Sequence, residues 1–118
     1  MPVYEITSES QFNNYLNDTT GNKYIFVDFY TQWCGPCKKI SPHVDKLSEM
    51  HSKVTFLKVD IDKCRSLADT YKIKSIPTFL IFKVGRPEPS EPIVGADIKK
   101  IENALKILTT NMELNEDF

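Results

Sequence analysis

Two cysteines separated by two residues are the part of this sequence best suited to chemistry. Cys34 and Cys37 enclose Gly35-Pro36 and follow Trp33. Helical positions three apart have Cβ atoms roughly 5–6 Å apart, and a disulfide needs about 3.5–4.5 Å, so a small adjustment closes a bridge. The pair could therefore form and break a disulfide as its chemical work.

The segments beside this pair predict a strand before it and a helix after it. Residues 24–30 are β-branched and aromatic, which is typical of a strand. Residues 38–50 place Ile40, Val44 and Leu47 at i, i+4 and i+7, which marks one face of a helix. A thiol in the first helical turn lies beside unpaired N–H groups and the positive end of the helix dipole, and both favour the reactive thiolate.

This context predicts different roles for the two cysteines. Gly35 leaves the sulfur of Cys34 approachable by another protein, and Pro36 suits an early helical position because it lacks an N–H. We expect Cys34 to be the exposed nucleophile and Cys37 the shielded resolving cysteine. Cys37 would then attack a mixed disulfide at Cys34 and release the reduced partner.

Zinc binding is another use of a Cys-x-x-Cys pair. It would need a second close pair of ligands, and the separation of His43 from His51 does not match the spacing of a zinc finger. We therefore expect no metal site.

Composition indicates an ordinary globular domain and disfavours some classes of partner. The chain has 118 residues, of which 41% are apolar and 26% charged, and a net charge of −1. Without an excess of cations, neither nucleic acid nor an anionic membrane is an expected partner. No apolar run approaches the roughly 20 residues that span a bilayer. No secretory signal is evident at the N-terminus, so we expect a cytoplasmic protein, with the nucleus as an open addition.

The remaining segments alternate between strand and helix patterns, and they predict an α/β fold. A central mixed sheet of four to five strands should be flanked by four helices on both faces. Prolines within 85–95 limit any strand there to a short edge strand. One domain is expected over residues 1–110, followed by an acidic, flexible tail over 111–118. The expected strands are 3–6, 24–30, 54–60 and 78–82, and the expected helices follow Ser8, Cys37, Cys64 and Asp97.

Five short motifs in this order resemble those of the thioredoxin family, from about Tyr4 to Leu108. The resemblance implies the thioredoxin fold and a dithiol–disulfide oxidoreductase that reduces protein disulfides and maintains cell redox homeostasis without a bound cofactor. It implies electrons from NADPH through a thioredoxin reductase, disulfide-containing clients, and a monomer. The motifs are Val-Asp-Phe-Tyr at 27–30, Trp-Cys-Gly-Pro-Cys at 33–37, Val-Asp-Ile-Asp at 59–62, Ile-Pro-Thr at 76–78 and Val-Gly-Ala at 94–96.

The resemblance implies a buried acid beneath the cysteines. Asp28 lies in an apolar strand, where its raised pKa would let it take the proton from Cys37. The alternative is an acid that reaches solvent. Lys58 would moderate the pKa of Asp28, although an outward-facing strand lysine explains it nearly as well.

The resemblance also implies a docking surface around Cys34. A cis Ile76–Pro77 bond would leave backbone groups free to pair with an extended client, whereas an ordinary trans proline in a turn is the alternative. The other members of this surface would be Trp33, Gly35, Pro36, Gly95 and Ala96.

Cys64 is left unpaired when Cys34 and Cys37 bridge. It is either a small apolar residue at a helix start, which we prefer, or a regulatory thiol that permits an oxidative dimer.

Two other functions use the same fold. A binding or adaptor subunit would dock its partners whatever its redox state, but it does not need Cys34–Cys37, Asp28 and Pro77 together. A disulfide oxidase or isomerase would run the exchange in the opposite direction, and Gly35-Pro36 disfavours it.

Overall fold

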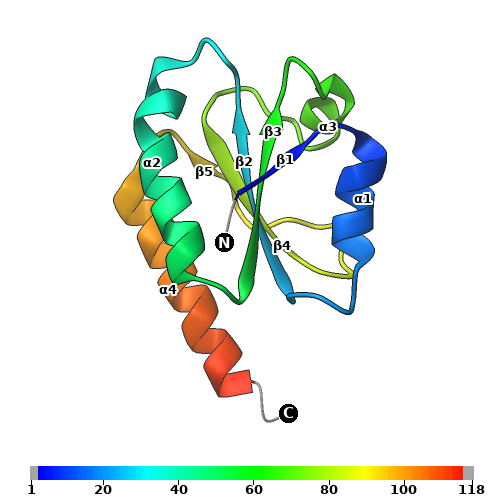
Figure 1. Cartoon of the computed structure of the whole chain (residues 1–118), viewed down its shortest axis with the longest axis vertical. Coiled ribbons are helices and arrows are strands. Elements are labelled where there is room, and N and C mark those ends of the chain that lie inside the picture. The colour runs from blue at the N-terminus through cyan, green and yellow to red at the C-terminus, as the bar shows by residue number, and fades with distance from the viewer. Residues whose placement is uncertain (1–2, 116–118) are drawn as a thin grey trace.

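A five-stranded sheet lies between two pairs of helices in the computed structural model, which describes residues 3–115 (Figure 1). The predicted α/β class, the mixed sheet of four to five strands and the four flanking helices are confirmed. The elements in chain order are β1 (Tyr4–Ile6), α1 (Glu9–Asn17), β2 (Tyr24–Tyr30), α2 (Gly35–Met50), β3 (Val54–Asp60), α3 (Arg65–Thr70), β4 (Thr78–Lys83), β5 (Ile93–Val94) and α4 (Ile98–Asn115).

Strand β2 occupies the centre of the sheet and carries the chain into the cysteine pair. The strand order is β1-β3-β2-β4-β5. Strands β1 and β2 run parallel to β3, whereas β4 is antiparallel to β2 and β5 is antiparallel to β4. Parallel neighbours need a crossover connection, and α2 supplies it between β2 and β3. The N-terminus of α2 is thereby held at the end of the central strand.

The two faces of β2 belong to two hydrophobic cores. Ile25, Val27 and Phe29 pack in the core beneath α1 and α3, whereas Phe26 packs in the core beneath α2 and α4. Successive strand residues point to opposite faces, so Asp28 lies on the same face as Phe26. Figure 1 shows α2 and α4 together on that face of the sheet. The acid and the cysteine helix therefore share one side of the sheet.

The last helix is longer than the sequence predicts. We expected a flexible tail from residue 111, but α4 continues through Asn115. Met112 is buried in the core beneath α2 and α4, because it extends the apolar stripe of Ile101, Leu105 and Leu108 along the helix. The final part of the predicted tail, residues 116–118, lies outside the described residues. No helix within residues 3–115 has the length and apolarity required to cross a membrane.

Candidate active site

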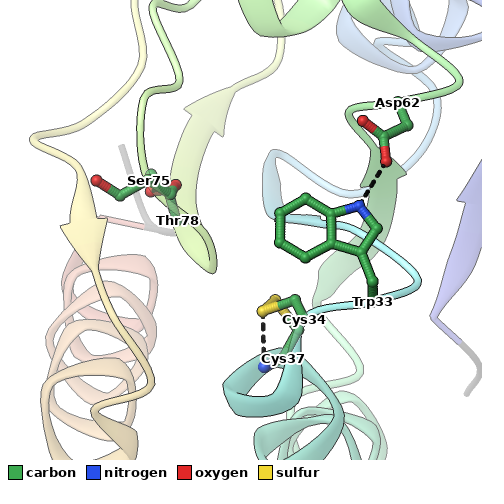
Figure 2. The surroundings of a disulfide bond; sticks show 6 residues. All are labelled: Trp33, Cys34, Cys37, Asp62, Ser75 and Thr78. Carbon is green, nitrogen blue, oxygen red and sulfur yellow. Dashed lines mark hydrogen bonds between the residues drawn. A yellow bond between two sulfur atoms is a disulfide. The ribbon is translucent and has the colours of Figure 1, made fainter.

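A disulfide joins Cys34 and Cys37 at the start of α2 (Figure 2). The Cα atoms of the two cysteines are 5.2 Å apart. Cys34 caps the helix, and the backbone N–H of Cys37 donates a hydrogen bond of 3.1 Å to the Cys34 sulfur. Pro36 fits the first turn, where backbone N–H groups have no partner within the helix. The Cys34 sulfur therefore lies at the positive end of α2, and a thiolate formed there would be stabilised.

Exposure does not distinguish the two cysteines, contrary to the sequence-based expectation. Cys34 is 4% exposed and Cys37 is 5% exposed, so an exposed Cys34 is wrong for the disulfide form. The physical reason is that the bridge holds the Cys34 sulfur against the first helical turn. The two cysteines differ instead in hydrogen bonding, since the amide of Cys37 donates to the sulfur of Cys34.

The indole of Trp33 is held beside the disulfide by an acid from the next loop. Trp33 is 72% exposed, and its Nε1–H donates a 2.9 Å hydrogen bond to Asp62 (Figure 2). The backbone N–H of Asp62 donates to buried Asp60, which also accepts a 3.4 Å bond from Gln32. Sequence reasoning did not assign roles to Asp60 and Asp62, although both lie in the 59–62 motif. They support the loop that presents Trp33.

The Ile76–Pro77 bond is cis, as the resemblance to thioredoxins implies, and the alternative of a trans proline is wrong. Ser75 and Thr78, on either side of this bond, lie in the surroundings of the disulfide that Figure 2 draws. The C=O of Pro77 accepts a 2.8 Å hydrogen bond from the N–H of Gly95. Gly95 has φ of 94°, a left-handed conformation that glycine adopts readily. The 76–78 and 94–96 motifs are therefore joined beside the cysteines.

The predicted docking residues form a mixed surface. Gly35, Pro36 and Ala96 are exposed, and they line one shallow groove of about 640 Å³ between the start of α2 and the start of α4. Ile76 and Gly95 are half-buried, whereas Pro77 is buried.

Asp28 lies beneath the disulfide with little access to water. It is 6% exposed, and its Oδ1 has no hydrogen-bond partner among the described residues. Burial raises the pKa of Asp28 to about 7, and the positive charge of Lys58 opposes that rise. Asp28 and Cys37 line the same small cavity of about 100 Å³. A proton on Cys37 therefore has a nearby acceptor that titrates close to neutral pH.

The ammonium group of Lys58 is shared with a second acid that sequence reasoning missed. Its Nζ is 3.8 Å from Oε1 of Glu5 and 5.8 Å from the centroid of the Tyr30 ring. The Tyr30 hydroxyl donates a 2.6 Å hydrogen bond to the same Glu5 oxygen. Burial and the adjacent Glu5 raise the pKa of Tyr30 above its usual range. Nothing in the sequence marks Glu5, because its position opposite Lys58 depends on the register of β1 against β3.

Cys64 packs in the core beneath α1 and α3, at the start of α3, as we expect from the sequence. It is 5% exposed, its thiol lies 3.7 Å from the C=O of Ile6, and burial raises the pKa of the thiol. Within the described part of the chain, no group of three or more His, Cys, Asp or Glu residues could hold a metal ion.

Comparison with known proteins gives one family. The family model described as Thioredoxin matches residues 3–107. Thioredoxin of Equus caballus is 42% identical over 104 residues, covering 88% of this chain and 96% of the relative. Thioredoxin of Homo sapiens is 41% identical over 106 residues, covering 90% and 98%. The solved structure of Plasmodium falciparum thioredoxin has a TM-score of 0.81 at 31% identity, covering 88% of this chain and 97% of that chain.

The family and the geometry agree on the chemistry. Thioredoxins need no bound cofactor, since the exchanging electrons are carried by the cysteine pair itself. The chain has that pair at a helix start, as the family's activity requires. It therefore belongs to the thioredoxin family and is a dithiol–disulfide oxidoreductase that reduces protein disulfides and serves cell redox homeostasis.

Proposed function

We propose that Cys34 attacks the client and that Cys37 resolves the mixed disulfide, with Asp28 as the proton acceptor. The Cys34 thiolate attacks one sulfur of the client disulfide, forms a bond to it, and expels the other client sulfur as a thiolate. Cys37 then passes its proton to the Asp28 carboxylate and attacks the Cys34 sulfur. The bond between Cys34 and the client breaks, and the second client sulfur leaves as a thiolate that takes up a proton. The client gains two electrons, and the pair ends as a disulfide.

One hydrogen bond carries this order of attack. The Cys37 N–H donates to the Cys34 sulfur over 3.1 Å, whereas the Cys34 N–H donates to the C=O of Thr31 over 3.4 Å and not to the Cys37 sulfur. This donor, together with the helix dipole, favours a thiolate at Cys34 over one at Cys37. The shared cavity of Asp28 and Cys37 supports the role of Asp28, and Lys58 would tune that role.

The proposed docking surface surrounds the disulfide. An extended client would lie along the 76–77 segment and contact Trp33 on one side and the groove beside Gly35 and Pro36 on the other. Gly95 and Ala96 would complete the surface, because Gly95 is bonded to Pro77.

We propose that electrons come from NADPH through a thioredoxin reductase, and that the chain works in the cytoplasm, with the nucleus as a second compartment. A reductant needs a supply that keeps its pair reduced, and reducing compartments provide one. NADPH consumption with a panel of thioredoxin reductases tests the electron source, and imaging of the tagged full chain tests the location. Failure with every reductase would contradict the proposed electron source. Exclusion of the tagged chain from the cytoplasm would contradict the proposed location.

The functional form is proposed to be a monomer. Burial of Cys64 supports this, because an oxidative dimer would require its sulfur to reach a second chain. Gel filtration of oxidised protein, with Cys64→Ser as the comparison, tests it. A dimer that the substitution abolishes would contradict it.

Trapping of mixed disulfides tests the central assignment. Cys37→Ser should accumulate a covalent complex with a disulfide-containing client such as insulin, whereas Cys34→Ser should form none. Both variants should lose catalysed reduction of insulin by dithiothreitol. A complex formed by Cys34→Ser through Cys37 would overturn the order of attack. Unchanged partner binding and biological activity in both variants would instead indicate the redox-independent adaptor.

A further inference from the structure

Three charged residues form one row across the sheet beneath the active site. Lys58 on β3 pairs in register with Glu5 on β1 and with Asp28 on β2. In parallel strands, residues paired in this way point to the same face of the sheet, so one lysine lies between two acids. Lys58 forms an ion pair with Glu5, in which its Nζ lies 3.8 Å from Oε1. Lys58 influences Asp28 through its charge alone.

Tyr30 holds this arrangement from the end of β2. Its hydroxyl donates to Oε1 of Glu5 over 2.6 Å, and that same oxygen faces the ammonium of Lys58. The Lys58 Nζ also lies 5.8 Å from the centroid of the Tyr30 ring, within the range of a cation–π contact. One tyrosine therefore contacts both members of the ion pair. The Glu5 Oε2 atom is buried without a hydrogen-bond partner among residues 3–115, so its position depends on the Oε1 contacts.

We propose that Glu5 and Tyr30 are positioning residues for the proton acceptor: Glu5 competes with Asp28 for the Lys58 ammonium, and the Tyr30 hydroxyl fixes Glu5 in that contact. The competition keeps a positive charge from approaching Asp28 more closely, and the negative charge of Glu5 itself disfavours a second carboxylate nearby. Both effects raise the affinity of the Asp28 carboxylate for a proton, so that Asp28 stays protonated to higher pH. This inference rests on the proposed role of Asp28 as the acceptor of the Cys37 proton.

Other charged and titratable groups also lie near Asp28. The negative charge of Asp45 on α2 also raises the pKa of Asp28, although less than Glu5 does. The remaining titratable groups lining the cavity beside Asp28 are Tyr30, Cys37, Lys38 and Lys58.

The decisive measurement is the titration of the Asp28 carboxyl by carbon NMR in oxidised full-length protein, where Cys34 and Cys37 are bonded and do not titrate. Glu5→Gln should lower the Asp28 midpoint by about one pH unit, because it releases Lys58 and removes a like charge. Tyr30→Phe changes no charge near neutral pH. It should lower the midpoint by a smaller amount, because an unanchored Glu5 turns to water and releases Lys58. Glu102→Gln, on the exposed face of α4, makes the same charge change and should leave the midpoint unchanged.

A double substitution separates positioning from simple charge repulsion. In a Lys58→Met background only the direct repulsion by Glu5 remains, so Glu5→Gln should shift the midpoint less than it does with Lys58 present. Equal shifts in the two backgrounds, or an unchanged or raised midpoint in Tyr30→Phe, would overturn the proposal. The NMR readout does not depend on turnover. The role of Asp28 as proton acceptor is tested in a separate experiment. If Asp28 were not the acceptor, Asp28→Asn would resolve mixed disulfides at the normal rate.

Discussion

Asp28 holds a proton close to neutral pH because it is buried without a full set of partners. Its Oδ1 accepts no hydrogen bond within the described chain, and Lys58 forms an ion pair with Glu5. Desolvation therefore outweighs the attraction of the lysine and raises the pKa from 3.8 to about 7. The same feature that suits Asp28 for proton transfer makes its charged form costly to the fold.

The pH dependence of stability should report this cost. The folded state holds the Asp28 proton to higher pH than the unfolded state, so the free energy of unfolding should fall as pH rises from 3.8 to about 7. The loss should reach about 4 kcal/mol above that window. Asp28→Asn removes the charge, so it should flatten this dependence and make the protein more stable than wild type at alkaline pH.

Denaturant unfolding at a series of pH values measures the effect. Asp69→Asn, an exposed acid on α3, is the matched control and should keep the wild-type dependence. Parallel curves for wild type and Asp28→Asn would contradict the buried, protonated acid.

At this scale, sequence reasoning found the residues whose chemistry is local. The Cys-x-x-Cys spacing and the acid in an apolar strand can both be recognised from the residues next to them in the sequence. Glu5 and Asp62 were missed, because their roles depend on partners 53 and 29 residues away in the pairs with Lys58 and Trp33. The predicted exposure of Cys34 was also wrong, because the motif alone does not show how far a closed disulfide buries the Cys34 sulfur.

Two helices on the same face of the sheet position the site. Helix α2 brings Cys34 and Cys37 to the end of β2, and its buried residues Ile40, Val44 and Leu47 fix it to the core. Helix α4 packs beside α2 in that core. The sequence predicted the apolar faces of both helices, because their periodicity is regular. It placed the end of α4 too early, because the acidic residues after 112 obscure the last apolar position.

A single substitution tests the length of α4. Met112 is 8% exposed, so Met112→Ala should lower the free energy of unfolding by about 2 kcal/mol or more through lost packing. Ile107 lies on the same helix but is 63% exposed, and Ile107→Ala should change stability by less than about 0.5 kcal/mol. Thermal or denaturant unfolding distinguishes the two. Equal effects would mean that Met112 belongs to a tail and not to the core.

The whole molecule places its reactive pair where one strand, one helix and two loops meet. Neither hydrophobic core includes Cys34 or Cys37, and the disulfide between them closes a loop of only a few residues. We therefore expect the fold to persist in both oxidation states of the pair. The alternation of strands and helices in the sequence was enough to predict this architecture, whereas the order of strands in the sheet requires the structure.

Reduction of the pair should lower the free energy of unfolding without unfolding the protein. Closing so short a loop restricts the unfolded chain modestly, so the reduced protein should lose about 2 kcal/mol of unfolding free energy. Fluorescence of Trp33, the single tryptophan, reports the site, and far-ultraviolet circular dichroism reports the whole fold. The two unfolding curves should coincide in each redox state. Separate transitions would show that the site unfolds independently of the sheet.

Alkylation of the reduced protein tests the central claim, that Cys34 is the attacking thiolate, most directly. Limited reaction with iodoacetamide over a range of pH, followed by peptide mass spectrometry, gives the reactivity of each of the three cysteines. We predict that Cys34 is labelled first, with a midpoint below the ordinary thiol pKa of about 8.5, because the Cys37 amide and the helix terminus stabilise its thiolate. Cys64 should be labelled last, since it is buried and the pKa of its thiol is raised. First labelling at Cys37, or equal reactivity of Cys34 and Cys37 at every pH, would contradict the account.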